Sequence, residues 1–357
     1  MKRMYVLLAV ILLLTVVAGG AAAQAPGVEG LVTVEVEGSV AETVAALEEI
    51  IEEQGLLLVS TVDHMENAAG VDLELRPTQL LIFGNPQLGT QLMQDEQSVG
   101  IDLPQKRLVW EDEDGAVYVS YNAPEYLRTR HGLDESGEVL STISNALAGL
   151  AESATGAEEA AEGTPETLPA AGGRGSLLPW ALVGGGAVLL GIGWRLRRNG
   201  GWALFLLAFA VPLLGLALSG TAHAQEGVRG LVVVDSPYDV AETVSRAQDA
   251  MEERGLTIMM TVDHGANAEG ADLELRPTQL IVFGNPQLGT QLMQAGQSVG
   301  IDLPQKMLVW EDAEGQVHLA YNDPQYLAQR HNLSGVDEVL STISGALSAI
   351  AEEATAE

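Results

Sequence analysis

The residues of this chain that could carry chemistry occur in pairs separated by 200 residues. Asp63 and His64 are matched in this way by Asp263 and His264. A carboxylate beside an imidazole can relay a proton or supply metal ligands. Adjacent residues on a strand point to opposite faces, however, so a surface or turn histidine is the alternative interpretation.

Two kinds of cation are matched as well. Arg76 and Arg276 stand in the motif LRPT, where a guanidinium can clamp a carboxylate or phosphate ligand through two hydrogen bonds. The alternative is that each arginine holds a carboxylate of the protein itself. Lys106 and Lys306 are the only lysines beyond residue 2. Each could form a Schiff base, contact an anion or complete a buried ion pair.

Asn85 and Asn285 lie in the motif FGNP-x-x-GT, and His131 and His331 end the motif RH. Glycines before a helix let backbone N–H groups approach a ligand, although a tight turn from strand to helix explains the motif equally. Its spacing matches neither a Walker nor a dinucleotide-binding fingerprint. Two matched histidines per copy are too few to fix zinc without carboxylates, so we predict no metal site and name no cofactor.

These pairs belong to a long internal repeat. Asp72–Gln94 and Asp272–Gln294 differ at only two positions, both apolar, and Gln97–Lys106 is identical to Gln297–Lys306. The offset holds without a gap from residues 28 and 228 to residues 151 and 351. We therefore expect two domains, 28–151 and 228–351, each long enough to bury a core. We expect the twelve matched residues to line one shared cleft, with scattered caps and ion pairs as the alternative.

Composition narrows the class of protein. The net charge is -32 and the sequence pI is about 4.3, so phosphate repulsion makes nucleic-acid binding unlikely. Hydrophobic residues make up 47% of the chain, which argues against an acidic disordered protein. The acidity itself favours a salt-adapted, halophilic surface. There is no cysteine, which excludes disulfides and thiolate metal sites.

Three apolar segments indicate a membrane. Residues 1–23 have the basic start, apolar centre and Ala-x-Ala end of a signal peptide, with an uncleaved anchor as the alternative. Residues 177–194 would cover about 27 Å as a helix, enough to span a bilayer, and 202–221 form a second span. The arginines at 195–198 should stay cytoplasmic, which predicts localisation in the cell membrane with both repeat domains extracytoplasmic.

The second span has another interpretation. Residues 195–224 also have the form of an internal signal peptide that ends in Ala-His-Ala, and cleavage after Ala224 would separate the repeats. Residues 152–176, which precede the first span, are rich in Ala, Glu, Gly and Thr and are expected to be a flexible linker.

Hydrophobic patterning predicts mixed elements in each repeat. Ser39 can cap a helix that ends near Gln54, before Gly55. Alternation or short apolar runs predict strands at 30–36, 56–62, 108–111 and 117–121, and a strand at 73–75 and 79–83 that is broken at Pro77. Further helices are expected at 86–94, 124–131 and 135–151. The fold class is α+β, with the order β-α-β(4)-α and helices on one face of a sheet.

Several motifs in fixed order identify a family. LRPT, FGNP-x-x-GT-x-LM, DLP-x-K, WED-x-x-G and YN-x-P-x-YL-x-x-RH stand at residues 75–131 and again 200 residues later. They resemble the domain-of-unknown-function family numbered 302. The resemblance implies a compact α+β domain with a TATA-binding-protein-like arrangement that forms homodimers. It implies no activity. The tandem copies and the expected membrane hairpin depart from the family's single-domain form.

Taken together, the sequence favours a membrane-tethered extracytoplasmic protein with two domains that bind or sense a small ligand. The matched cations in an acidic chain would suit an anionic small molecule. One alternative is an enzyme that uses Asp, His, Arg and Lys in a cleft, and another is a purely structural cell-envelope protein. The expected partners are the membrane and either the other repeat or a second chain in a homodimer.

Overall fold

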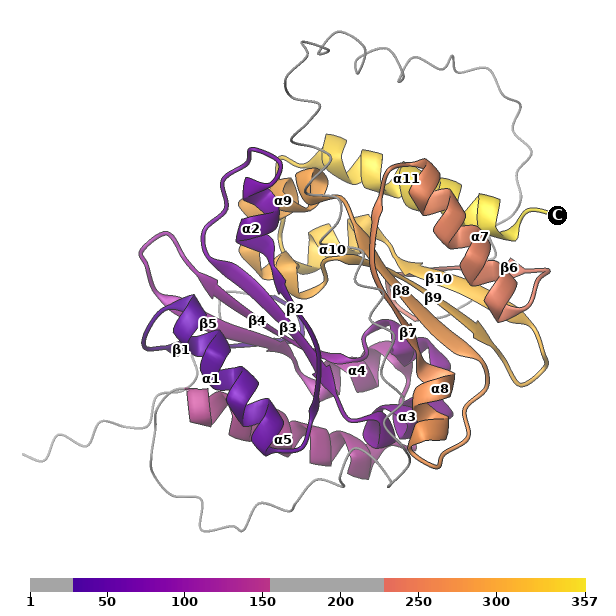
Figure 1. Cartoon of the computed structure of the whole chain (residues 1–357), viewed down its shortest axis with the longest axis horizontal. Coiled ribbons are helices and arrows are strands. Elements are labelled where there is room, and N and C mark those ends of the chain that lie inside the picture. Colours follow the sequence, from indigo (N-terminus) through magenta and orange to yellow (C-terminus); the bar gives the residue numbers. More distant parts are fainter. Residues whose placement is uncertain (1–27, 155–227) are drawn as a thin grey trace, which may run out of the picture.

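The computed structural model describes residues 28–154 and 228–357, and each range folds into the same α+β unit (Figure 1). We call them repeat 1 and repeat 2. Repeat 1 contains β1 (Leu31–Val36), α1 (Val40–Glu53), β2 (Leu57–Asp63), α2 (His64–Ala69), β3 (Thr78–Gly84), α3 (Pro86–Asp95), η1 (Gln97–Ile101), β4 (Gln105–Glu111), β5 (Val117–Asn122), α4 (Pro124–His131) and α5 (Gly137–Ala154).

Repeat 2 has the same order of elements. It contains β6 (Leu231–Ser236), α7 (Val240–Glu253), β7 (Thr257–Asp263), α8 (His264–Gly270), β8 (Thr278–Gly284), α9 (Pro286–Ala295), η2 (Gln297–Ile301), β9 (Gln305–Glu311), β10 (Val317–Asn322), α10 (Pro324–Arg330) and α11 (Asp337–Thr355).

Each repeat has one antiparallel five-stranded sheet. The strand order is β1-β5-β4-β3-β2 in repeat 1 and β6-β10-β9-β8-β7 in repeat 2, so β2 and β7 are edge strands. The two α+β units and the five strands of each sheet agree with the predicted fold class. Two short elements in each repeat, α2 and η1 with their copies α8 and η2, were not expected from the pattern.

The predicted strand at 73–75 is wrong. Residues 73–76 have no regular secondary structure, and Pro77 offers no N–H to a neighbouring strand. The alternation of apolar residues there has a tertiary cause, because Leu75 packs against the core of repeat 2 and Leu275 packs against the core of repeat 1.

Local signals explain where the main helices begin. Ser39 and Glu42 form a capping box at the start of α1, in which the Ser39 side chain accepts from the Glu42 backbone N–H. Asp239 caps α7 in the same position. Pro86 follows the capping Asn85 at the first turn of α3, where the missing N–H costs nothing.

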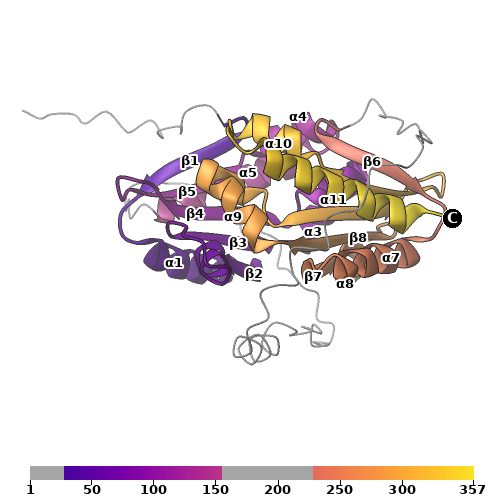
Figure 2. The ribbon, with the colours of Figure 1, turned by 90° about the horizontal axis from the view of Figure 1, so that it is seen from above.

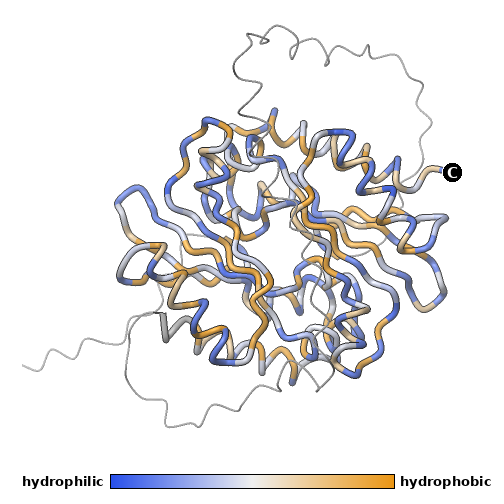
Figure 3. Tube along the Cα trace, in the orientation of Figure 1, coloured by the Kyte–Doolittle hydropathy of each residue, from blue (hydrophilic) through white to orange (hydrophobic). Residues whose placement is uncertain are grey.

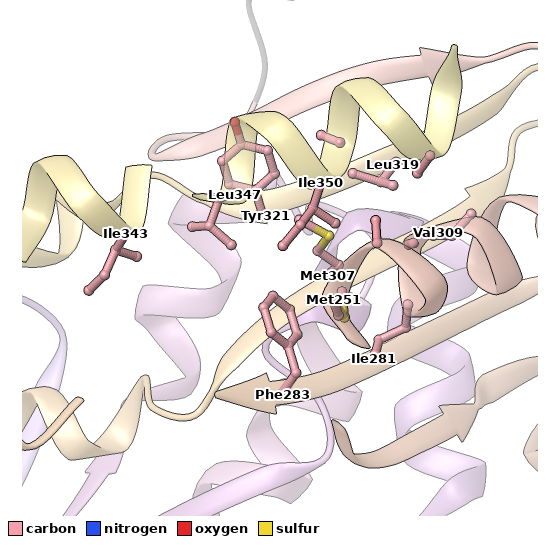
Figure 4. Packing of buried hydrophobic residues seen from close by; sticks show 14 of the residues in the cluster. Met251, Ile281, Phe283, Met307, Val309, Leu319, Tyr321, Ile343, Leu347 and Ile350 are labelled. Atoms are coloured by element: carbon pink, nitrogen blue, oxygen red, sulfur yellow. The ribbon is translucent and has the colours of Figure 1, made fainter. Parts of the chain in front are cut away.

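One face of each sheet packs against helices. In repeat 2, Phe283 of β8 and Met307 of β9 lie beneath Leu347 and Ile350 of α11 (Figure 4). The inward residues of these elements are almost completely buried. Burial of this apolar surface is the main force that holds the helices to the sheet.

The other face of each sheet packs against the other repeat. β3 is buried on both sides, since Leu81 and Phe83 face the helices while Leu80 and Ile82 join a second cluster that includes Ile301 of repeat 2. The strands at the centre of the molecule are accordingly apolar (Figure 3). Figure 2 shows the two units side by side, with β2 and β7 facing one another between them. A strand with two covered faces has a continuous apolar sequence, as LLIF does at 80–83.

No helix within residues 28–154 and 228–357 is long and apolar enough to cross a membrane. The described helices instead have one apolar face on a sheet and charged residues elsewhere, as Glu338 and Glu352 show in α11. The predicted localisation in the cell membrane, with both repeats extracytoplasmic, is therefore corrected. The predicted signal peptide (1–23), both spans (177–194 and 202–221) and the linker beyond Ala154 lie outside the described residues.

Glycine at position 30 provides a test of the packing between β1 and α4. Gly30 has a φ of +66°, and a Cβ there would lie 2.4 Å from the Tyr126 side chain. Gly115 has a φ of +83° with nothing within 4 Å of a Cβ. Both Gly→Ala changes carry the left-handed strain of about 1–2 kcal/mol. We expect Gly30→Ala to lower the free energy of unfolding by about 1–3 kcal/mol more than Gly115→Ala does, because only the Cβ at position 30 overpacks its surroundings.

Denaturant unfolding of the two variants measures this difference. Gly115→Ala serves as the control for backbone strain. Equal free energies of unfolding for both variants would contradict the packing of Tyr126 against Gly30.

Candidate functional site

The matched aspartates and asparagines are helix caps. Asp63 Oδ1 accepts from the Glu66 backbone N–H at 2.8 Å, and Asp63 Oδ2 accepts from Gln79 Nε2 at 3.0 Å. Asn85 Oδ1 accepts from the Gln87 backbone N–H at 3.0 Å. The same caps recur in repeat 2 at Asp263 and Asn285. These side chains thus have structural partners at the starts of α2, α3 and their copies.

The matched arginines cross between the repeats. Arg76 Nε and Nη2 donate to Gln297 Oε1 at 2.9 and 2.6 Å, and Gln297 Nε2 donates to Thr78 Oγ1 at 2.8 Å. Arg276 makes the same contacts with Gln97 at 3.0 and 2.8 Å. Each arginine therefore clamps a side-chain amide oxygen of the other repeat, and not a carboxylate of the protein.

His64 and His264 are buried against the other repeat as well. His264 Nε2 lies 3.3 Å from the carbonyl oxygen of Gly100, and His64 faces Gly300 in the same way. Burial lowers the pKa of both imidazoles to about 4. Both histidines are therefore neutral at pH 7, because burial outweighs the charge of the aspartate that precedes each of them.

A central cluster of charged residues lies where the two repeats meet. It consists of Asp102, Lys106, Arg130 and His131 and their copies Asp302, Lys306, Arg330 and His331, all of which are buried. Asp102 Oδ2 accepts from Arg130 Nη1 and from His131 Nε2, both at 2.8 Å. Burial alone would raise the pKa of Asp102, but Arg130 and His131 outweigh it and hold that pKa well below its usual range.

His131 holds Asp102 in place from one side of the cluster. Burial lowers the pKa of His131, so the ring is neutral and its Nε2 carries the proton that it donates to the ionised Asp102. Nδ1 then accepts from the Ser98 hydroxyl at 3.0 Å. His331 has the same partners in repeat 2, Asp302 and Ser298.

Each arginine of the cluster joins the two repeats. Arg130 Nη2 donates to Asn322 Oδ1 at 2.6 Å, and Arg330 Nη2 donates to Asn122 Oδ1 at 2.6 Å. The hydroxyls of Tyr126 and Tyr326 are 2.8 Å apart. The Arg330 guanidinium lies 4.1 Å from the centre of the Tyr126 ring, within cation–π range.

The two lysines complete the cluster without a carboxylate of their own. Lys106 Nζ donates to the backbone oxygen of Asp102 at 2.7 Å, and Lys306 Nζ donates to that of Asp302 at 2.8 Å. In the described part of the chain these are their only hydrogen bonds to protein atoms. Both lysines line a space of about 10 Å³ between Leu80, Ile82, Leu280 and Val282.

A much larger groove lies elsewhere. It has a volume of about 1470 Å³ and runs from β3, α3 and α5 of repeat 1 across the edge strands β2 and β7. Its lining is mostly apolar, with Phe83, Met93 and Leu147 among its walls. Of the twelve candidate residues, Asn85 and His264 line it.

The structure thus distributes the candidate residues over helix caps, inter-repeat contacts and the central cluster, and does not gather them in one cleft. Contact with a ligand stays a prediction for each of them. Sequence reasoning missed Asp102, Asn122, Tyr126 and Arg130, although all four stand in motifs that are identical in both repeats. Across residues 28–154 and 228–357, no group of three or more His, Cys, Asp or Glu is arranged to hold a metal ion.

The curated proteins that resemble this chain match only part of it and only part of their own length. A fluoride-specific ion channel, FluC 1 of Brucella suis biovar 1 (strain 1330), is 52% identical over 104 residues, which cover 29% of this chain and 41% of that protein. FluC 1 of Brucella abortus biovar 1 (strain 9-941) is 52% identical over 104 residues, or 38% of its length. The chain spans about two fifths of the length of the curated relatives that it matches.

A solved structure also matches one repeat. The crystal structure of an uncharacterized conserved DUF302 protein from Bacillus stearothermophilus is 20% identical, covers 36% of this chain and 99% of its own, and gives a TM-score of 0.33. The family profile described as "Domain of unknown function DUF302" matches residues 32–150 and 232–350. The chain therefore belongs to the DUF302 family and carries two copies of its domain.

Proposed function

We propose that the two repeats form one binding module for a small anion, which is held between Lys106 and Lys306. The observation that carries this proposal is the charge of the central cluster. Its four cations, Lys106, Lys306, Arg130 and Arg330, meet only two carboxylates, those of Asp102 and Asp302. With protonated lysines and neutral histidines the cluster has two positive charges in excess.

An uncompensated buried charge is costly. Taking a charged group out of water costs several kcal/mol unless a counter-charge and hydrogen bonds replace the water. Arg130 and Arg330 already occupy one oxygen of each aspartate, and the lysines bond only to backbone oxygens. A bound anion would supply both the missing charge and acceptors for the free ammonium hydrogens.

The size of the space restricts the ligand. A volume of about 10 Å³ is close to the lower limit for one water molecule. Such a space suits a monatomic anion and excludes a carbonyl substrate, which argues against Schiff-base chemistry at Lys106 or Lys306. The enzyme alternative also requires a nucleophile within reach of a base and a position for the reacting atom, which this space does not offer.

The comparisons suggest which anion to test first. Proteins named as fluoride-specific ion channels share 52% identity with this chain over 104 residues. Fluoride is a monatomic anion about as large as a water molecule, so we take it as the first candidate. We also propose that the two repeats are the halves of one dimer-like unit, in line with the homodimers and the TATA-binding-protein-like arrangement that the family resemblance implies.

A structural role is the competing interpretation. Burial lowers the pKa of Lys106, and burial together with the charge of Lys106 lowers the pKa of Lys306 to about 7. The cluster would then shed its excess charge by losing protons, without any ligand. An added anion should stabilise the folded chain if the cluster binds anions, and should not if the cluster is purely structural.

Substitution of the lysines tests the anion site. Fluoride at constant ionic strength should raise the melting temperature of the wild-type chain, because a ligand at 100 times its Kd stabilises the folded state by about 2.7 kcal/mol. In Lys106→Met and Lys306→Met this increase should be lost, while the folded state remains, since an apolar replacement of a buried charge is often neutral or stabilising.

Arg128→Met is the matched control, because Arg128 is an exposed cation that pairs with Glu125. It should keep the full response to fluoride. An equal response of the wild type and the lysine variants to fluoride, or no response of the wild type to fluoride, would rule out the site.

The pH dependence gives a second test. Because the folded pKa of Lys306 lies near 7 and its ordinary value is 10.5, the unfolded chain binds more protons between these values. Without an anion, the contribution of Lys306 to stability should therefore rise with pH across this window. The stabilisation by fluoride should instead decrease as pH rises, since the anion needs the protonated ammonium.

Thermal unfolding with and without fluoride, one pH unit below and one above 7, measures this effect. We expect the larger fluoride response at the lower pH. A response that is unchanged or larger at the higher pH would be inconsistent with an ammonium site.

A further inference from the structure

We propose that the large groove, which runs from repeat 1 across β2 and β7, binds a long-chain carboxylate, with the acyl tail along its apolar walls and the carboxylate at Arg107. This site is separate from the central cluster. Lys106 and Arg107 are neighbours on β4 but point to opposite faces of the sheet, Lys106 toward repeat 2 and Arg107 toward α5.

The groove suits the tail. Its volume of about 1470 Å³ exceeds that of ordinary ligand pockets, which hold about 300–1,000 Å³. Leu88 and Met93 of α3, Phe83 of β3, and Ile143 and Leu147 of α5 form its inner part. Beyond them the groove continues over Leu58 and Met259, two of the exposed large hydrophobic side chains. A flexible apolar chain could bury these surfaces along its length.

Polar groups at the inner end all offer hydrogen-bond donors. Thr90 and Gln105 line the groove, and both Thr90 Oγ1 and Gln105 Nε2 are buried without a partner among the described residues. Arg107 is not itself a lining residue, but it lies two residues after Gln105 on the same face of β4 and contacts Leu147, which lines the groove. Its Nε and Nη1 have no partner in residues 28–154 and 228–357, and Nη2 donates to the backbone oxygen of Leu147.

Arg107 is a buried cation that has no carboxylate partner among the described residues. The residue is completely buried, and its guanidinium carbon lies 4.5 Å from the centre of the Tyr121 ring. A planar guanidinium with two free N–H groups matches a carboxylate in geometry as well as in charge. We infer that the ligand carboxylate replaces the Leu147 oxygen at this arginine.

Repeat 2 lacks these features and serves as an internal comparison. Met307 stands at the position of Arg107 and is completely buried in the core. Arg246 of α7 also holds the end of α11, through the backbone oxygens of Ala354 and Ala356. The corresponding residue in repeat 1 is Ala46, which has no such reach. The proposed head-group site therefore belongs to repeat 1 alone, with one ligand per chain.

The charge of the head group follows from the single arginine. A monoanionic carboxylate neutralises one guanidinium, whereas a phosphate dianion would leave a buried negative charge in a chain whose net charge is -32. An alcohol or an ammonium head with the same tail would leave Arg107 without a counter-ion. The head group is thus the feature that separates this site from a non-specific apolar surface.

Calorimetric titration of the full-length chain with dodecanoate tests the proposal, with dodecanol and dodecylammonium as matched probes. We expect dodecanoate to bind once per chain and at least about tenfold more tightly than either probe. Arg107→Met should lose at least about tenfold in affinity, and it should fold, because repeat 2 already carries methionine at this position. Ala146→Trp, which fills the groove from α5, should weaken binding of the tail by a similar factor.

Two controls separate this site from the anion site. Arg128→Met removes an exposed arginine and should bind dodecanoate like the wild type, and so should Lys106→Met. Equal affinity of dodecanoate for the wild type and Arg107→Met, equal affinity of the wild type for all three probes, or no binding of dodecanoate would each overturn the proposal.

Discussion

The buried ion pair between Asp102 and Arg130, with its copy between Asp302 and Arg330, is the interaction on which the rest of the structure depends. Each arginine donates one hydrogen bond to the aspartate of its own repeat and another to an asparagine of the other repeat. Removing one partner of such a pair leaves a buried charge, at a cost of about 3–5 kcal/mol. Each buried ion pair therefore keeps one of its hydrogen bonds only when the other domain is present, and the central space between the lysines exists only when both domains are in place.

These contacts between the repeats explain why the two copies have identical sequences at the residues that contact the other repeat. The segment QSVGIDLPQK supplies Gln97, which binds Arg276, and Ile101, which enters the apolar cluster of the other sheet. Gly100 lets η1 approach β9, since a Cβ there would lie 3.0 Å from Leu308. A change in one copy would have to fit a partner surface formed by the other. Exposed positions such as Glu37 and Ser39, which face Pro237 and Asp239 in the second copy, carry no such coupling and differ.

The strands and helices within one repeat could largely be predicted from the sequence, because alternation, caps and turns are local signals. The capping Ser39 and the apolar run 80–83 are examples. The site could not be predicted, because its contacts join residues about 200 positions apart, as between Arg130 and Asn322. Leu75 alternates like a strand residue although it packs on the other repeat. His131 was predicted as a site residue because of its imidazole, but the neighbouring Arg130 makes the contact with the other repeat. Arg107 was missed because only the structure places it beneath α5 without a counter-ion.

The central claim is that the two repeats are one cooperative unit held together by these buried charges. Differential scanning calorimetry of the full-length chain and of Asp102→Asn tests it most directly. Our account predicts a single transition for the described domains, with equal calorimetric and van't Hoff enthalpies. It also predicts that Asp102→Asn, a change in repeat 1, lowers the melting temperature of repeat 2 together with that of repeat 1. Two separate transitions in the wild type, or a variant in which only repeat 1 melts earlier, would contradict it.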